Sequence, residues 1–286
     1  MIFLLLSILS STTIAVIFKL MAGKSIELLP VIVINYFAAL IAGLLLFDGE
    51  LSVQYILQSN WIYISIFIGS LLIIGFYLIG YTTQKAGIAI TTIANKMSVI
   101  IPVLFSIFYF SEATNWQKLL GMTLALVAVG MAVHKKEKGS SQFSFLPILM
   151  FLVIGTIDSS VKLAQHNYVP ESDVSLFSAL SFGLAGIIGL VILGFSSKYW
   201  SSFKKPMVWT YGILIGLANF GSLYFLIHAL NKSGLDSSIV YGVNSVGIII
   251  LSVSLAILFF SEKLSRINII GICLALVAVM ILMLWV

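Results

Sequence analysis

Long apolar stretches follow one another along the whole chain, each bounded by Pro, Gly, Asn or charged residues. Each stretch is close to the roughly 20 residues that an α-helix needs to cross the hydrocarbon core of a bilayer. The segments between them are short and leave no room for a separate soluble domain. The pattern predicts ten membrane-spanning helices, over 2–22, 29–47, 61–83, 88–110, 116–134, 145–165, 174–196, 207–230, 237–260 and 267–286.

The composition supports lipid as the surrounding solvent. The chain is 60% hydrophobic and 9% charged, whereas soluble domains are about 25% charged. Residues 1–22 lack a basic start and a cleavage site, so we expect them to stay as the first span rather than act as a signal peptide. The sequence therefore predicts an all-α, multi-pass protein of the cell membrane, in bacteria the inner membrane.

The chain also repeats itself. The segment from Phe108 to Met131 matches the segment from Leu258 to Ile281 at an offset of 150, and both contain the string LALVAV. Upstream the offset is 147, which aligns Gly69, Tyr77, Lys85 and Gly87 with Gly216, Tyr224, Lys232 and Gly234. The halves 1–138 and 139–286 hold five predicted spans each, and an odd number inverts the second half in the membrane. Inverted repeats are typical of secondary transporters, although a duplication can also simply enlarge a membrane protein.

The pairs Ser111–Glu112 and Ser261–Glu262 close the fourth and ninth spans, and each precedes a Gly-containing helix that ends in LALVAVG or LALVAVM. With the ten spans and two halves, this pattern resembles the EamA-type branch of the drug/metabolite transporter superfamily. The resemblance covers essentially the whole chain. It implies export or exchange of a small metabolite without an ATPase domain, but it names no solute because members differ widely in substrate.

Ionisable residues inside apolar spans are candidates for function, since a charge near the bilayer centre costs roughly 2.5–3.5 kcal/mol. Asp158 and Lys162 share a helical face, four residues apart in the acid-first order that favours an ion pair. They form either a structural pair or a contact for substrate or protons. Lys96, with Asn95 beside it, lies too deep in its span to snorkel comfortably, and its polar stripe lines a cavity or makes interhelical hydrogen bonds.

Polar rings and amides supply further candidates. Tyr77 and Tyr81 occupy the repeat positions of Tyr224 and His228, and a second stripe includes Tyr241, with Asn244 beside it. These side chains could stack on or hydrogen-bond a solute, or pack between helices with satisfied polar groups. We expect the substrate-binding residues to be Lys96, Asn95, Tyr77, Tyr81, Tyr224, His228, Tyr241 and Asn244.

We expect mainly structural roles for the other conspicuous residues. Glu112 and Glu262 are expected to stabilise the N-terminus of the helix that follows each of them, and Lys19 to snorkel to the interface. Glycines at 183, 186, 189, 212 and 216 are expected to allow close helix packing.

Several function classes lack their motifs. The sequence contains no Walker A motif, no H-E-x-x-H and no dinucleotide fingerprint, and its lone Cys273 lies in an apolar stretch. We expect neither a metal nor another cofactor. The net charge of +5 is scattered over short loops, which favours contact with anionic lipid headgroups over nucleic acid.

The loop charges bear on orientation. Ten Lys and Arg residues fall on the side opposite the termini and two on the terminal side, so the positive-inside rule places the termini outside. The family resemblance instead implies cytoplasmic termini.

The sequence therefore predicts a secondary transporter, not an enzyme, that moves a small polar metabolite by alternating access. The expected solute is amino-acid-like or an organic anion, carried by a monomer or homodimer. An intramembrane enzyme acting on a lipid-linked substrate is the main alternative, and a structural or sensory membrane protein is a third.

Overall fold

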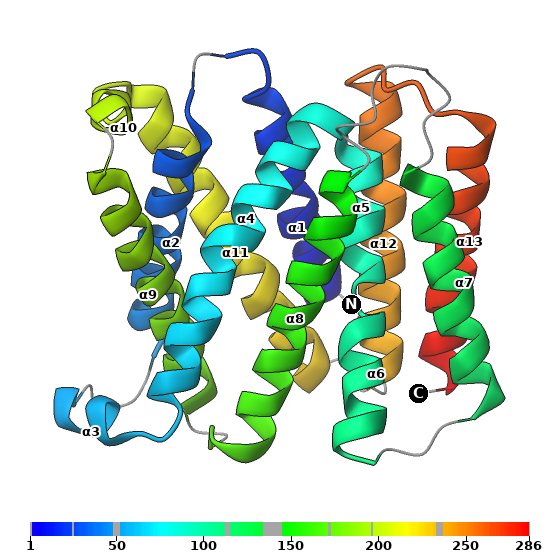
Figure 1. Ribbon diagram of the computed structural model, residues 1–286, viewed down its shortest axis with the longest axis horizontal. Helices are drawn as coiled ribbons and strands as arrows, with labels where there is room; N and C mark the ends of the chain where they lie inside the picture. Colours follow the sequence, from blue (N-terminus) through cyan, green and yellow to red (C-terminus); the bar gives the residue numbers. More distant parts are fainter. Residues whose placement is uncertain are drawn as a thin grey trace. The chain divides into compact units, whose positions relative to one another are not determined.

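The computed structural model describes residues 2–24, 26–47, 52–111, 115–133, 145–170, 173–195, 197–232 and 237–285. These residues form helices joined by short connections, with no strand among them (Figure 1). The helices are α1 (Ile2–Leu20), α2 (Leu28–Leu45), α3 (Val53–Gln58), α4 (Ile62–Ala86), α5 (Ile88–Met97), α6 (Ile100–Tyr109), α7 (Trp116–Val133), α8 (Phe145–Asn167), α9 (Val174–Gly194), α10 (Ser197–Ser202), α11 (Pro206–Lys232), α12 (Ser237–Leu258) and α13 (Arg266–Trp285).

Seven helical segments in the described part of the chain are long and apolar enough to cross a membrane. They are α1, α2, α4, the segment Ile88–Tyr109 that contains α5 and α6, α8, α9 and α11. Helices with internally paired backbones are the structure that an apolar chain adopts in lipid, where no water can satisfy its N–H and C=O groups. The expectation of an all-α membrane protein is confirmed.

The chain divides into two compact units. Unit 1 consists of Met1–Ala22, Leu78–Gly155 and Gly221–Val286, and unit 2 of Gly23–Tyr77 and Thr156–Phe220. Three helices, α4, α8 and α11, contribute to both units. Each unit thus draws segments from both predicted halves of the sequence, so neither unit coincides with a half.

In unit 1, α7 packs along α13, and α12 packs against α1, α5 and α13 (Figure 1). Ala125 and Ala128 of α7 and Ala275 and Ala278 of α13 are completely buried. They come from the two copies of the string LALVAV. Small side chains let helix backbones approach closely, which matters in lipid because apolar burial gives helices little reason to associate there.

In unit 2, α9 packs along α2 through its glycines. A Cβ atom at Gly186 would lie 3.2 Å from the Phe37 ring, and one at Gly189 would lie 2.5 Å from the Val33 side chain. On α11, a Cβ at Gly216 would lie 2.6 Å from the Asn35 carbonyl oxygen of α2. These distances confirm that the glycines predicted to allow close packing do so.

Candidate functional site in unit 1

The span from residue 88 to 109 is interrupted. Helix α5 ends at Met97 and α6 begins at Ile100, whereas the apolar pattern alone predicts one continuous helix. Pro102 causes the break, because a proline has no N–H to donate to the carbonyl four residues earlier and its ring crowds that carbonyl. The carbonyl in question belongs to Ser98.

The break has its own hydrogen bonds. The Ser98 carbonyl accepts from the N–H of Ile101 at 3.0 Å, and the N–H of Val103 donates to the Val99 carbonyl at 3.2 Å. The Ser98 hydroxyl donates to the Asn95 carbonyl at 2.6 Å. The Ser98 carbonyl is therefore held by a shorter i to i−3 turn and the Asn95 carbonyl by a side chain, while the Val99 carbonyl keeps an ordinary helical bond, so these backbone groups are paired as a membrane helix requires.

Two of the predicted site residues lie next to this break. Asn95 and Lys96 occupy the last turn of α5, and both side chains are half-buried. A cation at the C-terminal end of a helix is favoured by the helix dipole, an effect of about 0.3–1 kcal/mol. The dipole offsets part of the cost of placing the Lys96 charge at this depth.

The opposite end of α5 is fixed by Glu262. Its carboxylate accepts hydrogen bonds from the N–H groups of Ile88 at 2.8 Å and Ala89 at 3.4 Å. Lys19 Nζ lies 2.9 Å from the same carboxylate, and the side chains of Lys19 and Glu262 are only 20% and 11% exposed. One carboxylate thus satisfies two of the four unpaired N–H groups with which a helix begins and neutralises a half-buried lysine.

Two sequence expectations are corrected by this arrangement. Glu262 does not serve the helix that follows it. That helix, α13, is capped by Ser265 and Asn268: the N–H of Ser265 donates to Asn268 Oδ1 at 2.9 Å, and the N–H of Asn268 donates to Ser265 Oγ at 3.2 Å. Lys19 forms an ion pair with Glu262, whereas the sequence predicted only that it would snorkel to the interface. Glu112 lies outside the described residues.

Gly87 makes room for the Glu262 carboxylate. It has a φ of +98°, in the region that glycine alone adopts without strain. A Cβ atom there would lie 2.5 Å from a carboxylate oxygen of Glu262. Both the conformation and the space therefore require glycine at the start of α5.

The rings of α11 form a group of their own in unit 1. The ring centroids of Tyr224 and His228 are 4.1 Å apart, and Phe3 of α1 lies 5.3 Å from His228. His228 Nδ1 lies 3.0 Å from the Tyr224 carbonyl oxygen. A carbonyl oxygen can only accept, so this bond places a proton on Nδ1. The structure thus brings together two predicted site residues, packed as neighbours on one helix.

Several buried polar atoms in unit 1 have no hydrogen-bond partner within the described residues. Among them are Asn244 Oδ1 and Ser252 Oγ of α12, Thr12 Oγ1 of α1 and Thr82 Oγ1 of α4. An unsatisfied buried polar group costs about 1–3 kcal/mol, so such atoms usually meet water or a ligand. Sequence reasoning missed Thr12 and Thr82, because a threonine in an apolar helix gives no signal that it lacks a partner.

The remaining predicted residues are distributed between the units. Tyr81 of unit 1 has the Lys85 ammonium 5.8 Å from its ring centroid, and Tyr241 of the same unit is 51% exposed. Tyr77, Asp158 and Lys162 belong to unit 2.

The last two of these residues both lie on α8, where Asp158 is exposed and Lys162 half-buried. Their proposed ion pair stays a prediction. Among the described residues, no group of three or more His, Cys, Asp or Glu is placed to hold a metal ion.

Comparison with known proteins supports the fold. No family model matches the chain. An uncharacterized protein of Haemophilus influenzae is 27% identical over 284 residues, covering 96% of this chain and 95% of that protein. One protein of known crystal structure matches with a TM-score of 0.55 at 16% identity, covering 98% of this chain and 94% of its own. The fold therefore has a precedent among solved structures.

Proposed function

We propose that this protein is a secondary transporter that moves a small polar metabolite across the cell membrane by alternating access. It has ten spans in two inverted repeats of five, as in the EamA-type transporters that its sequence resembles. The direction is export or exchange. The solute binds in unit 1 at the break between α5 and α6.

The interrupted span carries this proposal. A helix that stops and restarts inside a membrane exposes backbone groups that need partners, and transporters use such breaks as binding sites. Here Pro102 imposes the break, and the half-buried Lys96 lies within the turn that precedes it. Retaining a lysine within a span is costly in lipid, and solute binding is a function that accounts for a lysine placed beside a break.

Three further observations support ten spans and a duplication. Besides the seven long candidates, α7, α12 and α13 contain shorter apolar helices over Leu119–Met131, Val243–Leu258 and Arg266–Leu282, which correspond to the three remaining predicted spans. Ser111 and Ser261, repeat mates in the sequence, have φ values of +53° and +50°, a conformation uncommon for any residue but glycine. The division between the two units falls after Tyr77 in α4 and after Phe220 in α11. Tyr224, the repeat mate of Tyr77, lies four residues after Phe220, so the two divisions fall at nearly equivalent positions of the repeat.

The charge of the site suggests the class of solute. Lys96 presents an ammonium group at the break, and an ammonium binds carboxylate or phosphate oxygens as a point charge. We therefore expect the solute to carry an anionic or zwitterionic group, as amino acids and organic acids do.

Counterflow in proteoliposomes tests the proposal. Vesicles loaded with one unlabelled pool of amino acids, organic acids, sugars and nucleotides receive labelled members of the pool outside, with and without a pH gradient. The proposal expects saturable, transient accumulation of at least one anionic or zwitterionic solute. The proposal would be contradicted if the protein gives no counterflow for any member of the pool although its cooperative unfolding shows that it is folded. Lipid-linked substrates would then be tested.

A further inference from the structure

A pocket in unit 2 is lined by residues that the transport proposal does not use. Its volume is about 320 Å³, at the small end of the roughly 300–1,000 Å³ typical of ligand sites. The lining residues come from the segment between α2 and α4 and from the segment between α8 and α9. These segments join the ends of apolar helices, so the pocket opens at a membrane surface rather than at mid-span.

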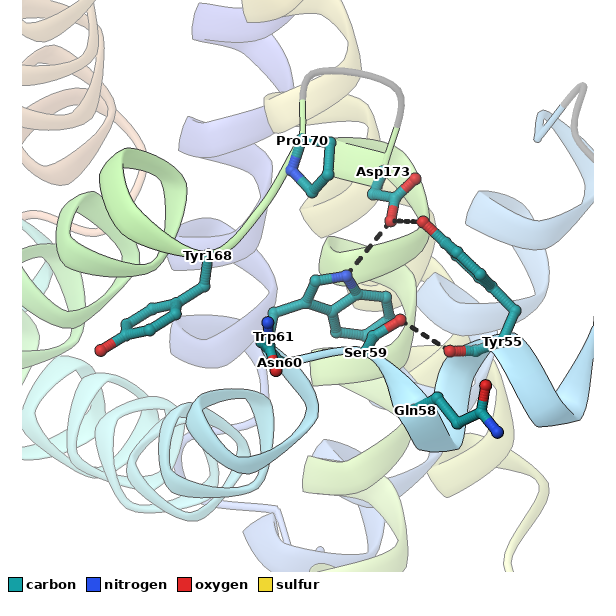
Figure 2. A pocket seen from close by; sticks show the side chains of 8 residues that line it. All are labelled: Tyr55, Gln58, Ser59, Asn60, Trp61, Tyr168, Pro170 and Asp173. Atoms are coloured by element: carbon teal, nitrogen blue, oxygen red, sulfur yellow. Dashed lines mark hydrogen bonds between the residues drawn. The ribbon is translucent and has the colours of Figure 1, made fainter.

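The chemistry of the lining is aromatic and acidic. Tyr55 and Tyr168 contribute exposed rings, Trp61 a ring that is 1% exposed, and Asp173 a carboxylate, and none of the described lining residues is Lys or Arg. In Figure 2 the Trp61 ring lies between the other two rings in the view, with Asp173 and Pro170 along one side. The polar residues Gln58, Ser59 and Asn60 complete the wall.

The Asp173 carboxylate is buried and held by hydrogen bonds. Asp173 is 6% exposed, and its Oδ2 accepts from the Tyr55 hydroxyl at 2.5 Å and from Trp61 Nε1 at 3.2 Å. Trp61 is itself fixed, since its ring meets the Phe177 ring edge-on at a centroid distance of 6.0 Å. Tyr55 is positioned by α3, whose first turn is capped by Ser52 Oγ, an acceptor for the Tyr55 N–H at 3.3 Å.

Tyr55 takes part in the pocket as a hydrogen-bond donor to Asp173. The hydrogen bond to Asp173, followed by burial and the charge of Asp173, raises the pKa of Tyr55 above its ordinary value of 10.0, so Tyr55 remains a neutral donor at physiological pH. Asp173 also precedes α9, whose positively polarised N-terminus favours a carboxylate at this position.

From this arrangement we propose that the pocket binds a ligand through an alkylammonium group, either a free amine or quaternary ammonium compound or the headgroup of a lipid. Ring faces attract organic cations through their quadrupole, and aromatic cages recognise quaternary ammonium in this way. Asp173 supplies the counter-charge. This binding site is independent of the proposed transport site, since none of its residues belongs to unit 1.

Calorimetric titration of the full-length protein with choline tests the proposal, in a detergent without an ammonium group. The control ligand is 3,3-dimethyl-1-butanol, which has the shape of choline without its charge. We expect choline to bind at least about tenfold more tightly than this alcohol. Equal affinity for both ligands, or no heat from choline, would overturn the proposal.

Two variants locate the binding. Asp173→Asn keeps an oxygen acceptor for Tyr55 and Trp61 but removes the charge, and Tyr168→Leu removes one ring without touching the hydrogen bonds. Each is expected to weaken choline binding about tenfold or more. Glu27→Gln, which removes a carboxylate at the other end of the 18-residue α2, should leave it unchanged. Unaltered affinity in Asp173→Asn protein with a wild-type unfolding temperature would overturn the assignment.

The source of the ammonium group is distinguished in lipid nanodiscs. If a lipid headgroup occupies the pocket, choline binds more weakly in phosphatidylcholine nanodiscs than in phosphatidylglycerol nanodiscs, and Asp173→Asn removes the difference. If the ligand is a free amine, choline affinity is the same in both lipids once added salt screens the charge of the phosphatidylglycerol surface. Binding of inorganic phosphate instead of choline would contradict either version.

Discussion

The two ends of α5 are built in opposite ways. At its beginning, two N–H groups, the Glu262 carboxylate and the Lys19 ammonium form a closed set of contacts at 2.8–3.4 Å. At its end, the helix stops before Pro102, and Lys96 lies half-buried in the last turn. Both ends have the charge that the helix dipole favours. One end is an anchor, and in the proposed mechanism the other is the place where the span changes its contacts.

The difference separates two uses of charge in a membrane protein. A charge that is paired and hydrogen-bonded mainly stabilises the fold, and removing one partner leaves the other uncompensated. In the proposed mechanism, a charge beside an irregular backbone exchanges its contacts for a ligand, so removing it changes binding more than stability. The anchored end should therefore respond in unfolding experiments and the broken end in transport experiments.

The largest effect is expected at the broken end. Lys96→Ala should reduce solute flux about 100-fold, because a lost charge-assisted hydrogen bond in a poorly solvated site costs about 1.5–3 kcal/mol. Expression and unfolding temperature should change little. The measurement is initial uptake into proteoliposomes, with the exposed Lys263→Ala as the matched control. Wild-type flux in Lys96→Ala would remove this residue from the site.

The anchored end should show the next largest effect, on stability. Glu262→Gln keeps an acceptor for the α5 N–H groups but leaves the Lys19 charge uncompensated, so unfolding should become easier by about 2 kcal/mol. A double-mutant cycle with Lys19→Met measures the coupling between the two side chains. Additive effects would show that the ion pair contributes nothing of its own.

A smaller effect on flux is expected from repairing the break. Pro102→Ala restores an N–H that can donate to the Ser98 carbonyl, so α5 and α6 can join into one helix. Stability should be equal or greater, while flux falls about tenfold because the binding geometry at residues 95 and 96 changes. If flux stays at the wild-type level in a protein whose helix is continuous, the break has no part in transport.

A series of three glycines should give graded effects that end in the smallest of all. Gly87→Ala should destabilise by about 1–3 kcal/mol, since it adds strain at positive φ and a Cβ against Glu262. Gly23→Ala, with a φ of +78° and open space around it, should cost only the strain. Gly130→Ala lies in a helix with open space and should be neutral or stabilising by up to about 1 kcal/mol. Thermal unfolding of the three variants measures this order, and equal shifts would contradict it.

The sequence predicted the helices well because the bilayer imposes one length and one polarity on every span. The apolar stretches at 29–47 and 174–196 became α2 and α9, and the glycines that pack them could be identified in advance. The break was also partly predictable from the sequence, since Pro102 has no N–H to donate to the Ser98 carbonyl. Its position at residues 98 and 99 was not, because it depends on hydrogen bonds such as that of the Ser98 hydroxyl.

The site contacts were harder to predict. Glu262 and Ile88 are 174 residues apart, and no local pattern connects them, so the nearest helix was the natural but wrong choice. Asp173 gave no signal either, since an acid in a loop is normally solvated. Its burial depends on Tyr55 and Trp61, which reach it from another segment of unit 2.

Accessibility of the break from the two sides of the membrane tests the central claim most directly. In a Cys273→Ser background, Asn95→Cys is exposed to a membrane-impermeant maleimide from the inside or the outside of sealed vesicles, with Lys263→Cys as an exposed control that should react from one side only. Alternating access at the break predicts modification of residue 95 from either side, slowed by a transported solute. Reaction from one side alone, or none while the control reacts, would contradict the account.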